Sequence, residues 1–244
     1  MNKKGSHVGM ILSFTLFITF ILFLYTISKP ALETNSDKKT ICGKIESLLI
    51  QNTSSNLTTI TVVIKQKPGD RESVELRGFL IISGLTFIPQ FIIKNRDSRI
   101  LDSYHKIPES VIVDRTSTDE TVLKVYHSKE FSSLSESEGS ASVKIRDNPE
   151  GYNIGSMTLD KYIFESQIEK LITFYDENYE QLKINLLVPS GIEFDFSFKK
   201  SDDTIMAPSI ERLRSNNVYS EETPVQYVDE NAIIQSGFIN IQVW

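Results

Sequence analysis

The chain has 244 residues, of which 40% are hydrophobic and 24% charged, the balance of an ordinary globular protein and not of a disordered or collagen-like chain. Residues 1–30 contain three lysines and no acidic residue, so the net charge of −6 leaves 23 basic and 32 acidic residues, a net of −9, in the rest. So acidic a surface argues against a nucleic-acid partner. The single cysteine, Cys42, excludes an internal disulfide framework and a cysteine-based zinc site.

The most apolar part of the chain lies near its start. The run Met10–Ile27 contains no charged residue, and with Val8 and Gly9 it would span about 30 Å as a helix. Its serine and threonine hydroxyls can bond to carbonyls one turn back, so they cost little in lipid. We therefore expect a transmembrane helix at residues 6–29, with residues 8–28 in contact with the lipid bilayer.

Three interpretations of this segment compete. A cleaved secretory signal is disfavoured because the apolar run exceeds the roughly 7–15 residues of a signal core and no Ala-x-Ala-like site follows it. An uncleaved signal anchor is the simplest alternative. Lysines flank both sides of the run, so they do not set its orientation. Two N-glycosylation sequons, at Asn52 and Asn56, favour a single-pass protein of the cell membrane with its C-terminal part extracytoplasmic.

The third interpretation rests on the residues before the apolar run. The start Lys3-Lys4-Gly5-Ser6 resembles the short class III leader of archaeal type IV pilin-like proteins, in which basic residues, a glycine and a small residue precede a hydrophobic helix. In that family a membrane peptidase cuts after the glycine. The resemblance thus implies a leader at residues 1–5 and cleavage between Gly5 and Ser6.

The resemblance extends along the chain, from GSHVGMILSF to the C-terminal PVQYVDE and FINIQVW, to pilin-like membrane proteins of small-genome archaea. It implies a structural or adhesive subunit of a cell-surface filament, whose partners are copies of itself or other pilin-like subunits. One departure concerns assembly: many pilins carry glutamate at the fifth mature position, which here is Met10. The alternative is a monomeric, signal-anchored binding module that forms no filament.

A second helix is expected directly after the membrane segment. Pro30 lacks an N–H group and crowds the preceding turn, so it should kink or end the first helix. Ile41, Ile45, Leu48 and Leu49 then lie on one face of a membrane-proximal amphipathic helix, residues 30–52, with Cys42 as a packing residue. Such a division resembles the two-part N-terminal helix of pilins. A short stalk beneath a separate domain is the alternative.

The remaining residues, 53–244, predict one exported α+β domain, because no repeat or linker divides them. A turn is expected at Asn52–Asn56. Strands are predicted at Leu57–Lys65, Ser73–Ile82, Phe87–Lys94, Val111–Asp114, Thr121–His127, Ala141–Arg146, Ile192–Phe198 and, as a terminal hairpin, Thr223–Asp229 and Ile233–Val243.

One long amphipathic helix is predicted to pack on these antiparallel strands. Ser166 and Glu169 form a capping box at its start. Six apolar residues then recur every three or four positions: Ile168, Leu171, Tyr175, Tyr179, Leu182 and Leu186. Lys183 is assigned to the solvent-facing side.

The sequence carries no recognisable catalytic pattern. The three histidines have no ligand spacing, and neither a phosphate-binding glycine loop nor a nucleophile elbow occurs. Glu193 and Asp195 share a strand face, and Glu136 and Glu138 could do so as well, so these carboxylate pairs are the acid–base candidates. Solvated strands commonly carry such pairs, so we expect no enzymatic activity, cofactor or metal ion.

Overall fold

The computed structural model describes residues 5–65, 73–85, 90–106, 110–114, 121–136, 143–146, 151–210, 212 and 217–244. Its helices are α1 (Gly5–Thr53), α2 (Phe79–Ile82) and α3 (Glu165–Asn185). Its strands are β1 (Ser54–Ile64), β2 (Ser73–Arg77), β3 (Phe91–Asn95), β4 (Ile100–Leu101), β5 (Ser103–Lys106), β6 (Ser110–Asp114), β7 (Val122–His127), β8 (Val143–Arg146), β9 (Tyr152–Phe164), β10 (Phe194–Lys199), β11 (Ile205–Met206), β12 (Tyr219–Val228) and β13 (Ile234–Val243).

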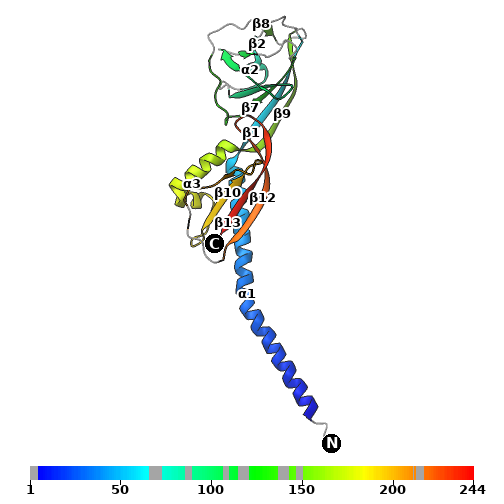
Figure 1. Ribbon diagram of the computed structural model, residues 1–244, viewed down its shortest axis with the longest axis vertical. Helices are drawn as coiled ribbons and strands as arrows, with labels where there is room; N and C mark the ends of the chain where they lie inside the picture. Colours follow the sequence, from blue (N-terminus) through cyan, green and yellow to red (C-terminus); the bar gives the residue numbers. More distant parts are fainter. Residues whose placement is uncertain are drawn as a thin grey trace.

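Helix α1 dominates the outline of the molecule. It is one continuous helix of 49 residues, about 73 Å long at 1.5 Å per residue. Figure 1 shows it as a bent rod that projects from a strand-rich body. The helix does not end at Pro30, contrary to one of the two outcomes expected there. Proline removes one backbone hydrogen bond, and the many remaining bonds of so long a helix outweigh that loss.

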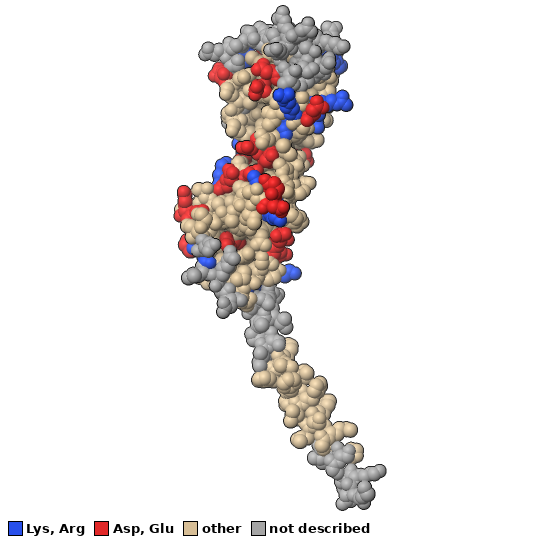
Figure 2. Space-filling model, viewed as in Figure 1, with Lys and Arg blue, Asp and Glu red and all other residues tan. Residues whose placement is uncertain are grey.

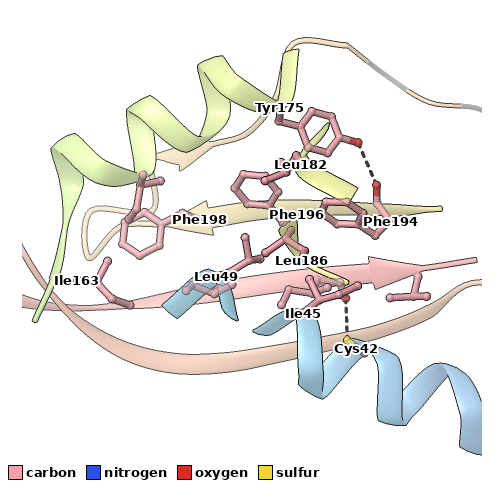
Figure 3. Close-up of a cluster of buried hydrophobic side chains, with 14 of the residues drawn as sticks. Cys42, Ile45, Leu49, Ile163, Tyr175, Leu182, Leu186, Phe194, Phe196 and Phe198 are labelled. Atoms are coloured by element: carbon pink, nitrogen blue, oxygen red, sulfur yellow. Dashed lines mark hydrogen bonds between the residues drawn. The ribbon is translucent and has the colours of Figure 1, made fainter. Parts of the chain in front are cut away.

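The second half of α1 is built into the body. Cys42, Ile45 and Leu49 are at most 1% exposed and lie in one core with side chains of α3, β10 and β13 (Figure 3). The predicted amphipathic face is therefore confirmed, as is the packing role of Cys42. The turn expected at Asn52–Asn56 is wrong, because α1 ends at Thr53 and β1 begins at Ser54.

The described strands form two sheets. The larger has the order β11-β10-β13-β12-β9-β1-β7-β3-β4, and the smaller has the order β5-β6-β2-β8. The long strand β1 is central: it pairs antiparallel with β7 on one side and with β9 on the other. The chain is thus α+β, with an apolar N-terminal helix and a strand-rich C-terminal part.

The core nearest α1 contains the alternating strand β10. Phe194, Phe196 and Phe198 point inward, as period-two alternation predicts. β12 and β13 form the expected terminal hairpin, and Ile239, Ile241 and Val243 are buried as predicted. Four buried side chains of α3 and that of its C-cap residue, Leu186, belong to the same core: the four are Ile168, Tyr175, Tyr179 and Leu182.

Two details of α3 differ from the prediction. Ser166 does not cap the helix: Phe164, with extended backbone, occupies the N-cap, and the buried Ser166 Oγ has no hydrogen-bond partner in the described part of the chain. The cause is β9, which stays paired with β1 and β12 up to its final residues and leaves no room for a capping turn. Lys183 is buried and not solvent-facing, because it pairs with Glu193.

The strand assignments failed at several places, and the short strands β4, β5 and β11 were also not predicted. The strand predicted at Ser73–Ile82 ends at Arg77, since Gly78 adopts φ 70° and the short helix α2 follows. Strand β9, which at 13 residues is the longest of the described strands, was not predicted. Residues 87–89 and 141–142 of two other predicted strands lie outside the described residues.

A second large core lies at the far end of the body, between the two sheets. It contains side chains of β1, β2, β3, β6 and β7, with Phe79 of α2. A smaller cluster contains Phe131, Phe164 and Val228. Beside it the buried Lys94 of β3 donates a hydrogen bond to the Ala232 carbonyl at 3.0 Å, which ties the β12–β13 turn to the far half.

Gly237 of β13 is required by close packing. A Cβ atom at this position would lie 2.7 Å from the Lys199 carbonyl oxygen and 3.0 Å from the Phe198 ring. The absence of a side chain lets Phe198 meet Tyr227 edge to face, with ring centroids 5.0 Å apart. The hairpin therefore closes tightly over β10.

The core position of α3 gives a stability prediction. Leu182 is 2% exposed, and Leu182→Ala should lower the free energy of unfolding by about 2–5 kcal/mol through lost burial and a cavity. Ile184, two residues further along, is 64% exposed, and Ile184→Ala should change the free energy of unfolding by less than about 0.5 kcal/mol. Denaturant unfolding followed by circular dichroism measures both. Equal losses would mean that the helix faces the wrong way.

Candidate functional site

The first half of α1 is the clearest functional element. Its segment Gly9–Thr26 has a mean hydropathy of 2.1 and no residue buried against the rest of the protein. By length and composition it can cross a membrane. Phe14, Phe17, Phe20 and Phe23 are all more than half exposed. In Figure 2 this part of the helix is free of charged side chains.

The threonine hydroxyls of this segment are satisfied within the helix. Thr15 Oγ1 donates to the Ile11 carbonyl at 2.9 Å, and Thr19 Oγ1 donates to the Thr15 carbonyl at 3.0 Å. Thr26 Oγ1 donates to the Phe23 carbonyl at 2.9 Å. These bonds match the expectation for hydroxyls in lipid, where an unpaired polar group is costly.

The proposed processing and modification residues lie at different places. Gly5 and Ser6 belong to the first turn of α1, whereas Lys3 and Lys4 lie outside the described residues. Asn52 is exposed at the end of α1, and Asn56 is exposed on β1. Both asparagine side chains are therefore accessible.

Asn56 opens onto a polar groove across the middle of the large sheet. The groove has a volume of about 460 Å³ and lies over β9, β1 and the end of β7. Its lining residues are Ser54, Ser55, Asn56, Thr58, Gly84, Leu85, His127, Ser128, Lys129, Leu159 and Lys161. None of these described residues carries a carboxylate. Hydroxyl, amide and ammonium donors can bind a polar or anionic ligand.

His127 is the most chemically versatile residue of this groove, and its surroundings keep it neutral. Burial lowers the pKa of His127, and its ring lies 5.1 Å from the ring of Phe91. A neutral imidazole can accept or donate a hydrogen bond, but it adds no charge at neutral pH. The groove therefore has the character of a binding surface.

A second cluster of ionisable groups joins α3 to β10. Glu193 accepts a hydrogen bond from Tyr179 Oη at 2.6 Å and one from Lys183 Nζ at 2.8 Å. The guanidinium of Arg212 lies over the Tyr179 ring, 3.3 Å from its centroid, and 5.4 Å from the Tyr175 centroid. The cluster thus joins four residues around one carboxylate.

The pKa shifts in this cluster describe a structural clamp. Burial would raise the pKa of Glu193, but hydrogen bonds from Lys183 and Tyr179 and the charge of Arg212 outweigh it, so the pKa lies below its ordinary value. Burial raises the pKa of Tyr175 to about 12, and burial together with Glu193 raises that of Tyr179 further. Both tyrosines stay protonated at neutral pH, where neither can act as a base.

The predicted pair Glu193 and Asp195 is divided between different contacts. Glu193 faces α3 through Lys183 and Tyr179, whereas the Asp195 carboxylate accepts a hydrogen bond from the Phe196 amide at 2.8 Å. In the part of the chain that the structure describes, no group of three or more histidine, cysteine, aspartate or glutamate side chains could hold a metal ion.

The groove and Arg212 were not found from the sequence. The groove collects residues from four separated segments, and the Asn56 sequon was its one visible signal. Arg212 reaches the cluster because Asp176 of α3 accepts hydrogen bonds from the Ser209 and Ile210 amides, which holds the preceding segment against the helix. The chain matches no protein-family model, no curated protein and no solved structure.

The clamp predicts a pH-dependent contribution to stability. Glu193→Gln removes the negative partner of the buried Lys183 and should cost about 1–3 kcal/mol at pH 7. Because the folded pKa of Glu193 is lowered, the wild-type contribution is complete above the ordinary value of 4.5 and is lost as the pH falls through the folded value. Unfolding free energies measured from pH 7 to pH 3 should therefore converge for the two proteins.

The exposed pair Lys199–Asp203, with an N–O distance of 2.7 Å, supplies the control. Asp203→Asn should change stability by less than about 0.5 kcal/mol, because surface ion pairs contribute little. Asparagine also tolerates the left-handed φ of 65° at this position. A Glu193→Gln effect no larger than that of Asp203→Asn would show that the clamp does not stabilise the fold.

Proposed function

We propose that the protein is a single-pass, pilin-like surface protein, anchored in the cell membrane by the first half of α1 and acting as a structural or adhesive subunit through its extracytoplasmic body. The observation that carries the proposal is the division of one helix into two environments. Gly9–Thr26 is wholly exposed and apolar, whereas Cys42, Ile45 and Leu49 are buried in the body. A helix of this kind holds its domain at a fixed position above the membrane.

Three further features support a filament subunit. An exposed apolar helix can pack against copies of itself once it leaves the lipid, as in the pilin-like family that the leader resembles. The long helix α3 lies in the same core as the antiparallel strands β10 and β13. The start Lys3-Lys4-Gly5-Ser6 directly precedes the apolar segment. We assign the body to the extracytoplasmic side because Asn52 and Asn56 belong to N-glycosylation sequons. Both side chains are exposed, as modification requires.

Leader cleavage is tested by the mass of the mature chain. In cells that contain a prepilin peptidase, intact-mass spectrometry should find a chain that starts at Ser6. Gly5→Val should abolish this cleavage. Gly9→Ala is the matched control, because a Cβ atom at Gly9 would meet nothing within 4 Å and the cleavage site is unchanged. A start at Met1 or Asn2 contradicts processing, and a start beyond residue 28 indicates a secretory signal.

Assembly is tested on sheared surface material. Electron microscopy with antibodies against the body should label filaments in wild-type cells and none in Gly5→Val cells, since an uncleaved leader holds the helix in the membrane. Labelled membranes without labelled filaments would contradict the structural role. That result would favour the second candidate function, a monomeric signal-anchored binding module.

The observation that favours this second candidate is the groove lined by Asn56, Lys129 and Lys161. It gathers hydroxyl and ammonium donors in an acidic body, although Lys129 Nζ also lies 3.8 Å from Glu130 Oε1. Such a lining suits a polar ligand that bears negative charge. Binding of acidic sugars by the full-length protein, lost in a Lys129→Gln, Lys161→Gln double variant, would support it.

A further inference from the structure

Strand β9 has one open edge. On its other side it pairs with β1 along nearly its whole length. On the open side, β12 meets it only at Ile163 and Phe164. All seven residues 155–161 are exposed, with Met157 at 50% and Leu159 at 64%. On the open side, no strand of the described chain pairs with residues 155–161. Their outward backbone groups can therefore bind a further strand.

The edge is only partly protected against such pairing. A register shift opposite Gly155 and Ser156 forms a bulge at one end of the stretch, and Lys161 stands at the other. The four residues between them include no proline and no lysine. The outermost strands of the same sheet, β11 and β4, are only two residues long. Short edge strands commonly protect a sheet against pairing with another chain. β9, with 13 residues, lacks this protection.

We propose that β9 pairs antiparallel with β9 of a second copy of this chain. Two identical strands that pair antiparallel are related by a two-fold axis perpendicular to the sheet. Paired side chains then lie on the same face of the sheet only if one residue on the axis lies opposite the same residue of the second copy. Thr158 is the midpoint of the exposed stretch 155–161, so a register centred on Thr158 pairs all seven residues, and any shift shortens the pairing.

The side chains are complementary in this register. On one face, Met157 lies opposite Leu159 of the second copy, and the pair occurs twice by symmetry. Such apolar cross-strand pairs stabilise a sheet. On the other face, Ser156, whose hydroxyl donates to Thr61 Oγ1 at 3.1 Å, lies opposite Asp160 of the second copy. Lys161 lies opposite Gly155, so no like charges meet within the seven pairs.

The pairing inverts one molecule relative to the other. β9 runs along the body in roughly the direction of its long axis (Figure 1), so the two α1 helices point in opposite directions. This consequence rests on the proposed function, because it places the second copy in a facing membrane. Seven paired residues bury far less accessible surface than a stable interface, which buries about 1,200–2,000 Å² in total. Many copies on two surfaces would therefore be needed for firm adhesion.

Cysteine cross-linking of the full-length protein in detergent tests the register. Paired Cα atoms in an antiparallel sheet lie about 4.5–5.5 Å apart, within the range of a disulfide. Thr158→Cys should therefore form a covalent dimer under mild oxidation. Ser156→Cys is the matched control on the same strand, since its Cα would lie about 14 Å from its own copy. The native Cys42 is buried, and burial raises its pKa to about 12, so it does not contribute.

The expected result is about tenfold more dimer for Thr158→Cys than for Ser156→Cys. Met157→Cys mixed with Leu159→Cys should also cross-link, whereas each alone should not. Equal dimer from Thr158→Cys and Ser156→Cys, or dimer from neither, overturns the proposal.

Vesicle clustering tests the arrangement between membranes. Vesicles that carry the wild-type protein should cluster, and Met157→Lys with Leu159→Lys should abolish clustering because lysines would face each other. Met157→Lys with Leu159→Glu places opposite charges together and should restore it. Cross-linking in detergent without vesicle clustering overturns the facing-membrane arrangement, while it supports the self-pairing of β9.

Discussion

The burial of one face of α1 is the contact on which the rest of the molecule depends. Ile45 and Leu49 lie in one core with the inward phenylalanines of β10 and the buried side chains of α3 (Figure 3), and Cys42 lies 3.9 Å from the Ile241 carbonyl of β13. Without these side chains the first core would lose one wall. With them, the direction of the exposed half of α1 is set by the body.

The same contact explains why the ionisable groups near α3 are structural. Once α1 occupies one side of the first core, α3 must cover the other, and Tyr179 and Lys183 come to face the start of β10. A lysine there needs a carboxylate, which Glu193 supplies. The open features of the body lie elsewhere, at the middle of the sheet, where β1 and β9 continue beyond the first core towards the second.

Features with a strong local period were predictable from the sequence. The buried face of α1, the face of α3, the alternation of β10 and the terminal hairpin each repeat with the period of their element. Strand β9 was missed because its burial does not alternate: residues 155–161 are exposed on both faces, so Met157 and Leu159 stand among polar residues without a pattern. The groove was missed because sheet pairing, and no local signal, brings Lys129, Lys161 and Asn56 together.

The direct junction of α1 and β1 has a mechanical consequence. The helix ends at Thr53 and the strand begins at Ser54, with no loop that could absorb extension. A pull on the projecting half of α1 therefore acts along the axis of a central strand. The hydrogen bonds of β1 to β7 and β9 would be loaded together in shear, and would not open one after another. The body is thus attached to its helix in the geometry in which a sheet resists force best.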